Sequence, residues 1–134
     1  MAMKYLLHLS FWILPLWITA WNIKPAADPF DDVVKALRAG NATELSRYFD
    51  NMIQITLLDQ SNSYSKAQAT MILKDFFSKN PVKSFQLIHE GGQDSRFGIG
   101  RMVTANGTCR ITFFLRQHGP DQYVLQEIRF EAQT

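Results

Sequence analysis

The sequence contains a single cysteine, Cys109, so no disulfide bond can form within the chain. Lysine and arginine outnumber aspartate and glutamate by only 14 to 12, and the basic side chains are scattered rather than gathered in one stripe. Nucleic-acid-binding proteins usually concentrate positive charge, so we expect no nucleic-acid partner. Stability must come from the packing of apolar residues, which make up 46% of the chain.

Metal-binding and cofactor-binding motifs are also missing. The histidines after the N-terminal segment are isolated, and Cys109 has no companion cysteine, so no metal-ligand spacing is present. The glycines in segments 91–92 and 98–100 do not stand between a predicted strand and a predicted helix, as a phosphate-binding loop requires. We therefore expect neither a metal nor a cofactor.

Residues 1–20 have the pattern of a signal peptide. Lys4 supplies a positive charge, and the mostly apolar run from Tyr5 to Ala20 contains Pro15 and is shorter than the roughly 20 residues of a membrane-spanning helix. We predict cleavage after Ala20, or as late as Ala27. The protein is then exported, periplasmic or extracellular, and it meets a membrane only through its leader. An uncleaved membrane anchor is the alternative.

The rest of the chain, residues 28–132, is predicted to form one α+β domain that begins with helices. Apolar residues recur at helical spacing in segments 28–40, 41–52 and 65–80. Ser65 and Gln68 form a capping box at the start of the third helix, whose apolar face includes Phe76 and Phe77. We expect these two phenylalanines to pack inside a curved sheet.

Strands are predicted where the apolar period changes to two, in segments 52–58, 83–90, 97–104, 108–116 and 123–130. Asp59 to Ser63 is predicted as a polar turn. The element order is therefore α-α-β-α-β-β-β-β, and the last four strands form a meander. Gly98 and Gly100 share one face of their strand, which indicates either a bend or bulge, or a strand packed under a large side chain.

This order resembles the nuclear transport factor 2-like superfamily, whose fold is a cone made by a bent sheet wrapped around helices. Four segments carry a closer resemblance: Asp32 to Asn41 leading into Leu45 to Phe49, Tyr64 to Ala69, Phe76-Phe77, and Tyr123 to Phe130. In these segments the chain is similar to an exported bacterial family, domain of unknown function 4783. The resemblance implies a cone but brings no known reaction and no catalytic residues, because the superfamily contains both enzymes and non-enzymatic binding modules.

Two residues are candidates for a catalytic acid, base or ligand contact inside such a cone. His89 follows Phe85 and Leu87 at alternate positions, and Arg101 is in phase with Ile99, so either side chain would point inward if these apolar faces do. The alternatives are a histidine at a strand end and a surface arginine with a buried stem.

Phe114 stands among polar residues on the strand face opposite Cys109, which suits a homodimer interface or another partner surface. Tyr64 and Tyr123 are the other candidates for a ligand or partner surface. Cys109 alternates with the apolar residues Ile111 and Phe113 along its predicted strand, and this pattern predicts a buried, inert thiol.

Two functions follow from these observations. The first is a non-catalytic exported module that binds a small apolar ligand or a protein partner, with a homodimer as one form. The second is a small cone-type enzyme, of the isomerase or dehydratase class, that acts on an apolar substrate.

Overall fold

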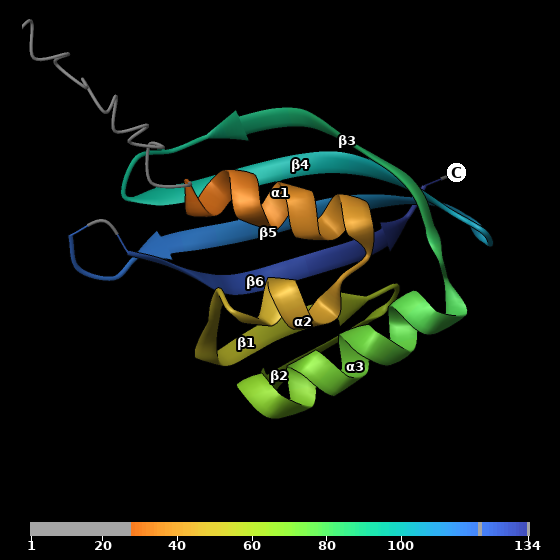
Figure 1. Cartoon of the computed structure of the whole chain (residues 1–134), viewed down its shortest axis with the longest axis horizontal. Helices are drawn as coiled ribbons and strands as arrows, with labels where there is room; N and C mark the ends of the chain where they lie inside the picture. The colour runs from red at the N-terminus through yellow and green to blue at the C-terminus, as the bar shows by residue number, and fades with distance from the viewer. Residues whose placement is uncertain (1–27, 121, 134) are drawn as a thin grey trace, which may run out of the picture.

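The computed structural model describes residues 28–120 and 122–133, and these form three helices beside one six-stranded sheet (Figure 1). The predicted signal peptide lies outside the described residues. The helices are α1 (Pro29–Ala39), α2 (Ala42–Ser46) and α3 (Lys66–Lys79). The strands are β1 (Phe49–Leu57), β2 (Gln60–Ser65), β3 (Val82–Gly91), β4 (Ser95–Thr104), β5 (Gly107–Gln117) and β6 (Tyr123–Ala132).

The strands are arranged in the order β2-β1-β6-β5-β4-β3, and all neighbours are antiparallel except the parallel pair β1 and β6. Strands β3 to β6 form the predicted meander. The helices lie on one side of the curved sheet, which we call the inner face, and the opposite side is the outer face (Figure 1). The predicted α+β class, with a curved sheet around helices, is confirmed.

Helix α1 has a capping residue at each end. The Asp28 side chain accepts a hydrogen bond from the backbone N–H of Phe30 at 3.1 Å, and Pro29 occupies the first turn, where its missing N–H costs nothing. Gly40 ends the helix with a φ of 62°, a left-handed conformation that glycine adopts without steric cost. These caps fix the apolar side of α1, including the fully buried Leu37, against the sheet.

Helix α1, rather than α3, covers the middle of the meander (Figure 1). The Phe30 ring of α1 lies 5.2 Å from the Phe113 ring of β5, measured between ring centres. Helix α3 lies beside β1 and β2, and its Phe76 and Phe77 rings pack on Phe130 of β6 at 4.7 and 6.0 Å. The predicted packing of these phenylalanines against the sheet is confirmed. The prediction that α3 lies inside the curve of the meander is corrected. Helix α1 occupies that position, because it has the more continuous buried face.

The structure corrects the predicted turn over residues 59–63. Only Leu58 and Asp59 form the turn, and Gln60–Ser65 pairs with β1 as an antiparallel strand. This strand lies at the edge of the sheet, and its uncharged polar side chains are mostly exposed, so it lacks the alternation of apolar residues that marks a half-buried strand. The observed element order is therefore α-α-β-β-α-β-β-β-β.

The second helix is shorter than predicted. Helix α2 ends at Ser46, and β1 begins at Phe49, three residues before the predicted strand start at Met52. Phe49 and Ile53 are both buried. A spacing of four residues is even, so it fits one face of a strand as well as one face of a helix, and this ambiguity explains the wrong boundary.

Gly98 and Gly100 of β4 lie on the inner face beneath aromatic rings. A Cβ atom at Gly98 would lie 2.3 Å from the Phe113 ring, and one at Gly100 would lie 2.4 Å from the Phe85 ring. Strand β3 also carries a register shift just after the residue that pairs with Gly100. Both predicted uses of these glycines are therefore present, a close ring contact and a neighbouring bulge.

Candidate functional site

The inner face of the sheet is filled by the protein's own side chains. Fully buried residues from two helices and four strands occupy it: Phe30, Ile55, Leu73, Met102, Phe113 and Phe130. Among the described residues, Thr104 is the only buried polar one, and its hydroxyl donates to the Gly107 carbonyl at 3.1 Å. No ionisable side chain of the described chain is buried at the floor of a cone pocket.

Arg96 joins the start of α1 to β4. Its guanidinium donates hydrogen bonds to both carboxylate oxygens of Asp28, at 2.7 and 3.1 Å, and lies 4.7 Å from the centre of the Phe30 ring. These hydrogen bonds hold the pKa of Asp28 below its ordinary value. The guanidinium also lies 5.5 Å from the ring of Tyr123, whose hydroxyl donates to the Gln93 carbonyl at 3.4 Å. Tyr123, a predicted surface residue, thus supports this ion pair.

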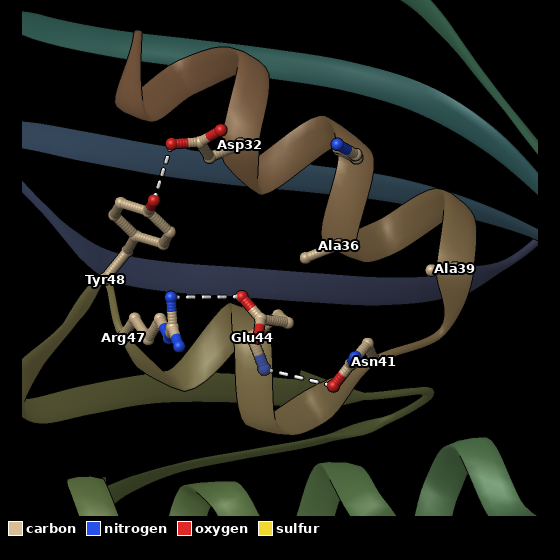
Figure 2. Close-up of a pocket in the computed structure, with 8 residues that line it drawn as sticks. Asp32, Ala36, Ala39, Asn41, Glu44, Arg47 and Tyr48 are labelled. Atoms are coloured by element: carbon tan, nitrogen blue, oxygen red, sulfur yellow. Dashed lines mark hydrogen bonds and ion pairs between the residues drawn. The ribbon is translucent and has the colours of Figure 1, made fainter. Parts of the chain in front are cut away.

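A charged groove with a volume of about 340 Å³ separates α1 from α2 (Figure 2). Helix α1 contributes one wall, and α2 with its flanking residues contributes the other. The lining residues are Asp32, Lys35, Ala36, Ala39, Asn41, Glu44, Arg47 and Tyr48. The groove therefore presents two acidic and two basic side chains around a pair of alanines.

The polar side chains of this groove bond mainly to one another (Figure 2). The Tyr48 hydroxyl donates to the Asp32 carboxylate at 2.6 Å, and the Arg47 guanidinium lies 3.5 Å from the Glu44 carboxylate. The Asn41 side chain accepts a hydrogen bond from the Glu44 backbone N–H at 3.0 Å and caps α2. A ligand would have to displace these internal contacts, so the groove is a poorer candidate site than the outer face.

Tyr48 is expected to ionise at an unusually high pH. Burial and the hydrogen bond to Asp32 raise the pKa of Tyr48 from 10.0 to about 12. Because the folded protein holds this proton more tightly, the associated stability is present below about pH 10 and is lost as the pH rises toward 12. Ultraviolet titration of phenolate should show one late phase, which Tyr48→Phe abolishes. In Asp32→Asn the pKa should fall but stay above 10.0, because the burial remains; an unmoved late phase would contradict the role of the hydrogen bond.

The outer face carries an apolar patch formed by Phe97 and Ile99 on β4 and Phe114 on β5, which we call the outer-face patch. Phe97 and Phe114 are directly opposite each other in the antiparallel pair, and both are half-buried. The Arg129 guanidinium lies 5.5 Å from the Phe114 ring and donates to the Glu127 carboxylate at 2.7 Å. A shallow depression of about 520 Å³ lies beside Phe114. Aromatic and arginine side chains are the residue types enriched at protein interfaces.

The predicted residues His89 and Arg101 do not meet in a pocket, and both are exposed. A register shift between Leu87 and His89 breaks the alternation along β3, so His89 lies opposite Ile99 of the outer face. Arg101 shares that outer face with Ile99, because the intervening Gly100 faces inward. The expectation that either side chain points into the cone is therefore corrected.

Tyr64 and Cys109 lie at the margin of the core. Tyr64 is opposite the buried Ile53 and packs against the core, while Cys109 lines an apolar depression of about 440 Å³ together with Phe76. Burial raises the pKa of the Cys109 thiol, which therefore stays protonated at neutral pH. Within residues 28–120 and 122–133, no three histidine, cysteine, aspartate or glutamate side chains are placed to hold a metal ion. In the same ranges, no helix has the length and apolar character to cross a membrane.

Comparison with solved structures identifies close likenesses. A DUF4783 family protein from Bacteroides fragilis is 37% identical, with a TM-score of 0.73, and the match covers 76% of this chain and 96% of that one. A DUF4783 family protein from Bacteroides uniformis is 32% identical, with a TM-score of 0.75 and coverages of 78% and 96%. The search of curated proteins found no match.

A more distant likeness shows the fold alone. An NTF2-like protein of unknown function from Cytophaga hutchinsonii is 6% identical, with a TM-score of 0.57, and the match covers 79% of this chain and 88% of that one. The family model of domain of unknown function 4783 (DUF4783) matches residues 30–131, nearly the whole of the described domain. The chain therefore belongs to the DUF4783 family and has the nuclear transport factor 2-like fold.

Proposed function

We propose that this chain is an exported, non-catalytic module that binds a protein partner through the outer-face patch. The observation that carries the proposal is the opposed pair of Phe97 and Phe114, which is half-buried on the sheet face away from the helices. Large aromatic side chains on an open sheet face lose contact with water when a partner covers them, and this supplies binding energy. The neighbouring Arg129 and Glu127 provide the polar rim that such interfaces have.

The direction of the pKa shifts in this protein supports a non-catalytic role. Asp28 is tied to Arg96, and the phenol of Tyr48 and the thiol of Cys109 are both weaker acids than usual. None of these shifts brings a group closer to proton exchange near neutral pH, which a general acid or base requires. With the inner face filled by core residues, no specific observation favours an isomerase or dehydratase.

Site-specific photocrosslinking in the producing cells tests this proposal. A benzophenone-bearing phenylalanine analogue at position 97 keeps an aromatic side chain in the outer-face patch. The same analogue at position 71 is the matched control, because Met71 lies on α3 and is 72% exposed. We expect one discrete protein adduct from position 97 and none from position 71. Equal adducts from both positions, or none from position 97, would contradict the proposal.

The mass of the adduct identifies the partner. An adduct of twice the chain mass would show that the partner is a second copy, and sedimentation of Phe114→Arg should then show a monomer where the unmodified protein is a dimer. An adduct of any other mass shows a different protein. Phe114→Arg should reduce its yield as well, because a charge in the centre of the outer-face patch must be desolvated on binding.

A further inference from the structure

Two arginines face each other beside the outer-face patch. Arg101 of β4 and Arg110 of β5 are directly opposite partners in the antiparallel ladder, and both side chains are exposed on the outer face. Like charges directly opposite on neighbouring strands repel and destabilise the pairing. The pairing of Arg101 with Arg110 therefore costs stability, and Glu131, which is opposite Arg110 on β6, offsets part of this cost.

Neither arginine forms an ion pair within the described residues. No carboxylate oxygen of residues 28–120 or 122–133 lies within 4.0 Å of either guanidinium. Gln86, which is opposite Arg101 on β3, is uncharged, and Glu131, which is opposite Arg110 on β6, forms no ion pair with it. By contrast, Arg129 on the same face is paired with a carboxylate at 2.7 Å.

The opposed arginines are continuous with the outer-face patch. Arg101 follows Ile99 by two residues along β4, so their side chains project from the same face of the strand. A partner that covers Ile99 and Phe97 also approaches the two guanidinium groups and removes part of their water. Burying unpaired charge is costly, so a stable complex needs anionic groups at this position.

We infer that the partner of the outer-face patch is a protein segment that presents carboxylates to Arg101 and Arg110; this inference rests on the proposed function. A second copy of this chain is a poor source of these groups, because Glu127 of this face is already paired and Glu131 is the one other acidic side chain among its described β5 and β6 residues. A nucleic acid is disfavoured because its backbone is bound by long basic stripes, whereas here two cations adjoin an apolar patch.

A carbodiimide test detects the predicted carboxylates directly. Arg110→Lys keeps the positive charge and supplies an amine, which forms an amide with a carboxylate that the carbodiimide has activated. Met71→Lys on α3 is the control for nonspecific coupling. With the cell fraction that contains the partner, we expect an amide between position 110 and an aspartate or glutamate of the partner, and none at position 71. Coupling of position 110 only to Glu131 of the same chain, coupling at neither position, or equal coupling at both would overturn the inference.

Charge reversal separates this inference from the proposed function. In the double variant with Arg101→Glu and Arg110→Glu, the yield of the photocrosslink from position 97 should fall by about tenfold or more. The double variant with Arg101→Lys and Arg110→Lys keeps both positive charges and should retain the yield. An unchanged yield in the glutamate variant would overturn the acidic partner and leave binding at the outer-face patch intact. If position 97 gave no adduct when both arginines are present, the proposed function and this inference would both be contradicted. An adduct with nucleic acid or lipid would also overturn the inference.

The urea-unfolding midpoint of the double glutamate variant guards against misfolding as the cause of any loss, and the single variant Arg101→Glu tests the repulsion between the two arginines. Because this substitution replaces repulsion with attraction across β4 and β5, the midpoint of urea unfolding should not decrease. A decrease would show that Arg101 has a structural role, which contradicts its assignment to partner binding.

Discussion

Replacing Phe113 with alanine is expected to lower the free energy of unfolding by about 3–5 kcal/mol. Phe113 is fully buried, its ring lies 5.2 Å from that of Phe30, and it covers Gly98 of the neighbouring strand. Truncation would leave a cavity between α1 and the sheet. This cavity could not collapse easily, because the Asp28–Arg96 ion pair fixes the start of α1.

Urea unfolding, followed by circular dichroism, measures this loss. Phe114→Ala is the matched control, because Phe114 is the next residue on β5 but lies on the outer face and is only half-buried. We expect a loss for Phe114→Ala of at most about 1 kcal/mol. Similar losses for the two variants would contradict the assignment of these neighbouring phenylalanines to opposite faces.

The elements that were predicted correctly are those whose signals are local. Asp28 caps α1 in the structure, and Ser65 with Gln68 forms the capping box at the start of α3. A cap involves residues two or three positions apart, so the sequence of one segment contains all that is needed to recognise it. The meander was predictable for the same reason, since each of its strands alternates apolar and polar residues and adjacent strands are joined by short turns.

Features that depend on distant residues were missed. Arg96 was not recognised as a structural residue, because its partner Asp28 lies 68 positions earlier in the chain. The register shift before His89 appears only in the pairing of β3 with β4, and it moves His89 to the face opposite the one that simple alternation predicted. Strand β2 was missed because it has no alternating apolar residues that would indicate a strand. Its extended conformation is instead stabilised by hydrogen bonding to β1, which the sequence of the segment does not reveal.

The candidate site was only partly predictable, and β4 shows why. The outward position of Phe114 followed correctly from the alternation along β5. The face of β4 that carries Ile99 and Arg101 was expected to point inward, and Phe97, two residues before Ile99, belongs to that face. In the structure Gly98 faces the core, where the Phe113 ring occupies the space that its missing side chain leaves. In this part of β4 the inward positions are glycines, so the large apolar side chains are on the outer face. This is the reverse of the usual pattern, in which the apolar side chains of a strand face the core.

Gly98→Ala tests this explanation and is expected to cost about 1–3 kcal/mol, as overpacking in a filled core does. The added Cβ would lie 2.3, 2.6 and 3.0 Å from the Cζ, Cε1 and Cε2 atoms of Phe113. The ring is fully buried beside Phe30, so it cannot swing away. The clash therefore has to be relieved by moving β4 away from β5 or by displacing α1.

The same substitution should become nearly neutral in Phe113→Leu, because leucine lacks the three ring atoms that the added Cβ would meet. In that background any remaining strain from the added Cβ is opposed by the gain from replacing glycine, which weakens a strand interior through its conformational freedom. Gly100→Ala is the control: its Cβ would meet the Phe85 ring at 2.4 Å and the Gln86 carbonyl at 2.9 Å, so its cost should be the same in the Phe113→Leu background as in the unmodified protein. A double-mutant cycle by urea unfolding measures the coupling. If Gly98→Ala cost as much in the leucine background as in the unmodified protein, the penalty would come from the backbone, and the Phe113 ring would not be what requires glycine on the inner face of β4.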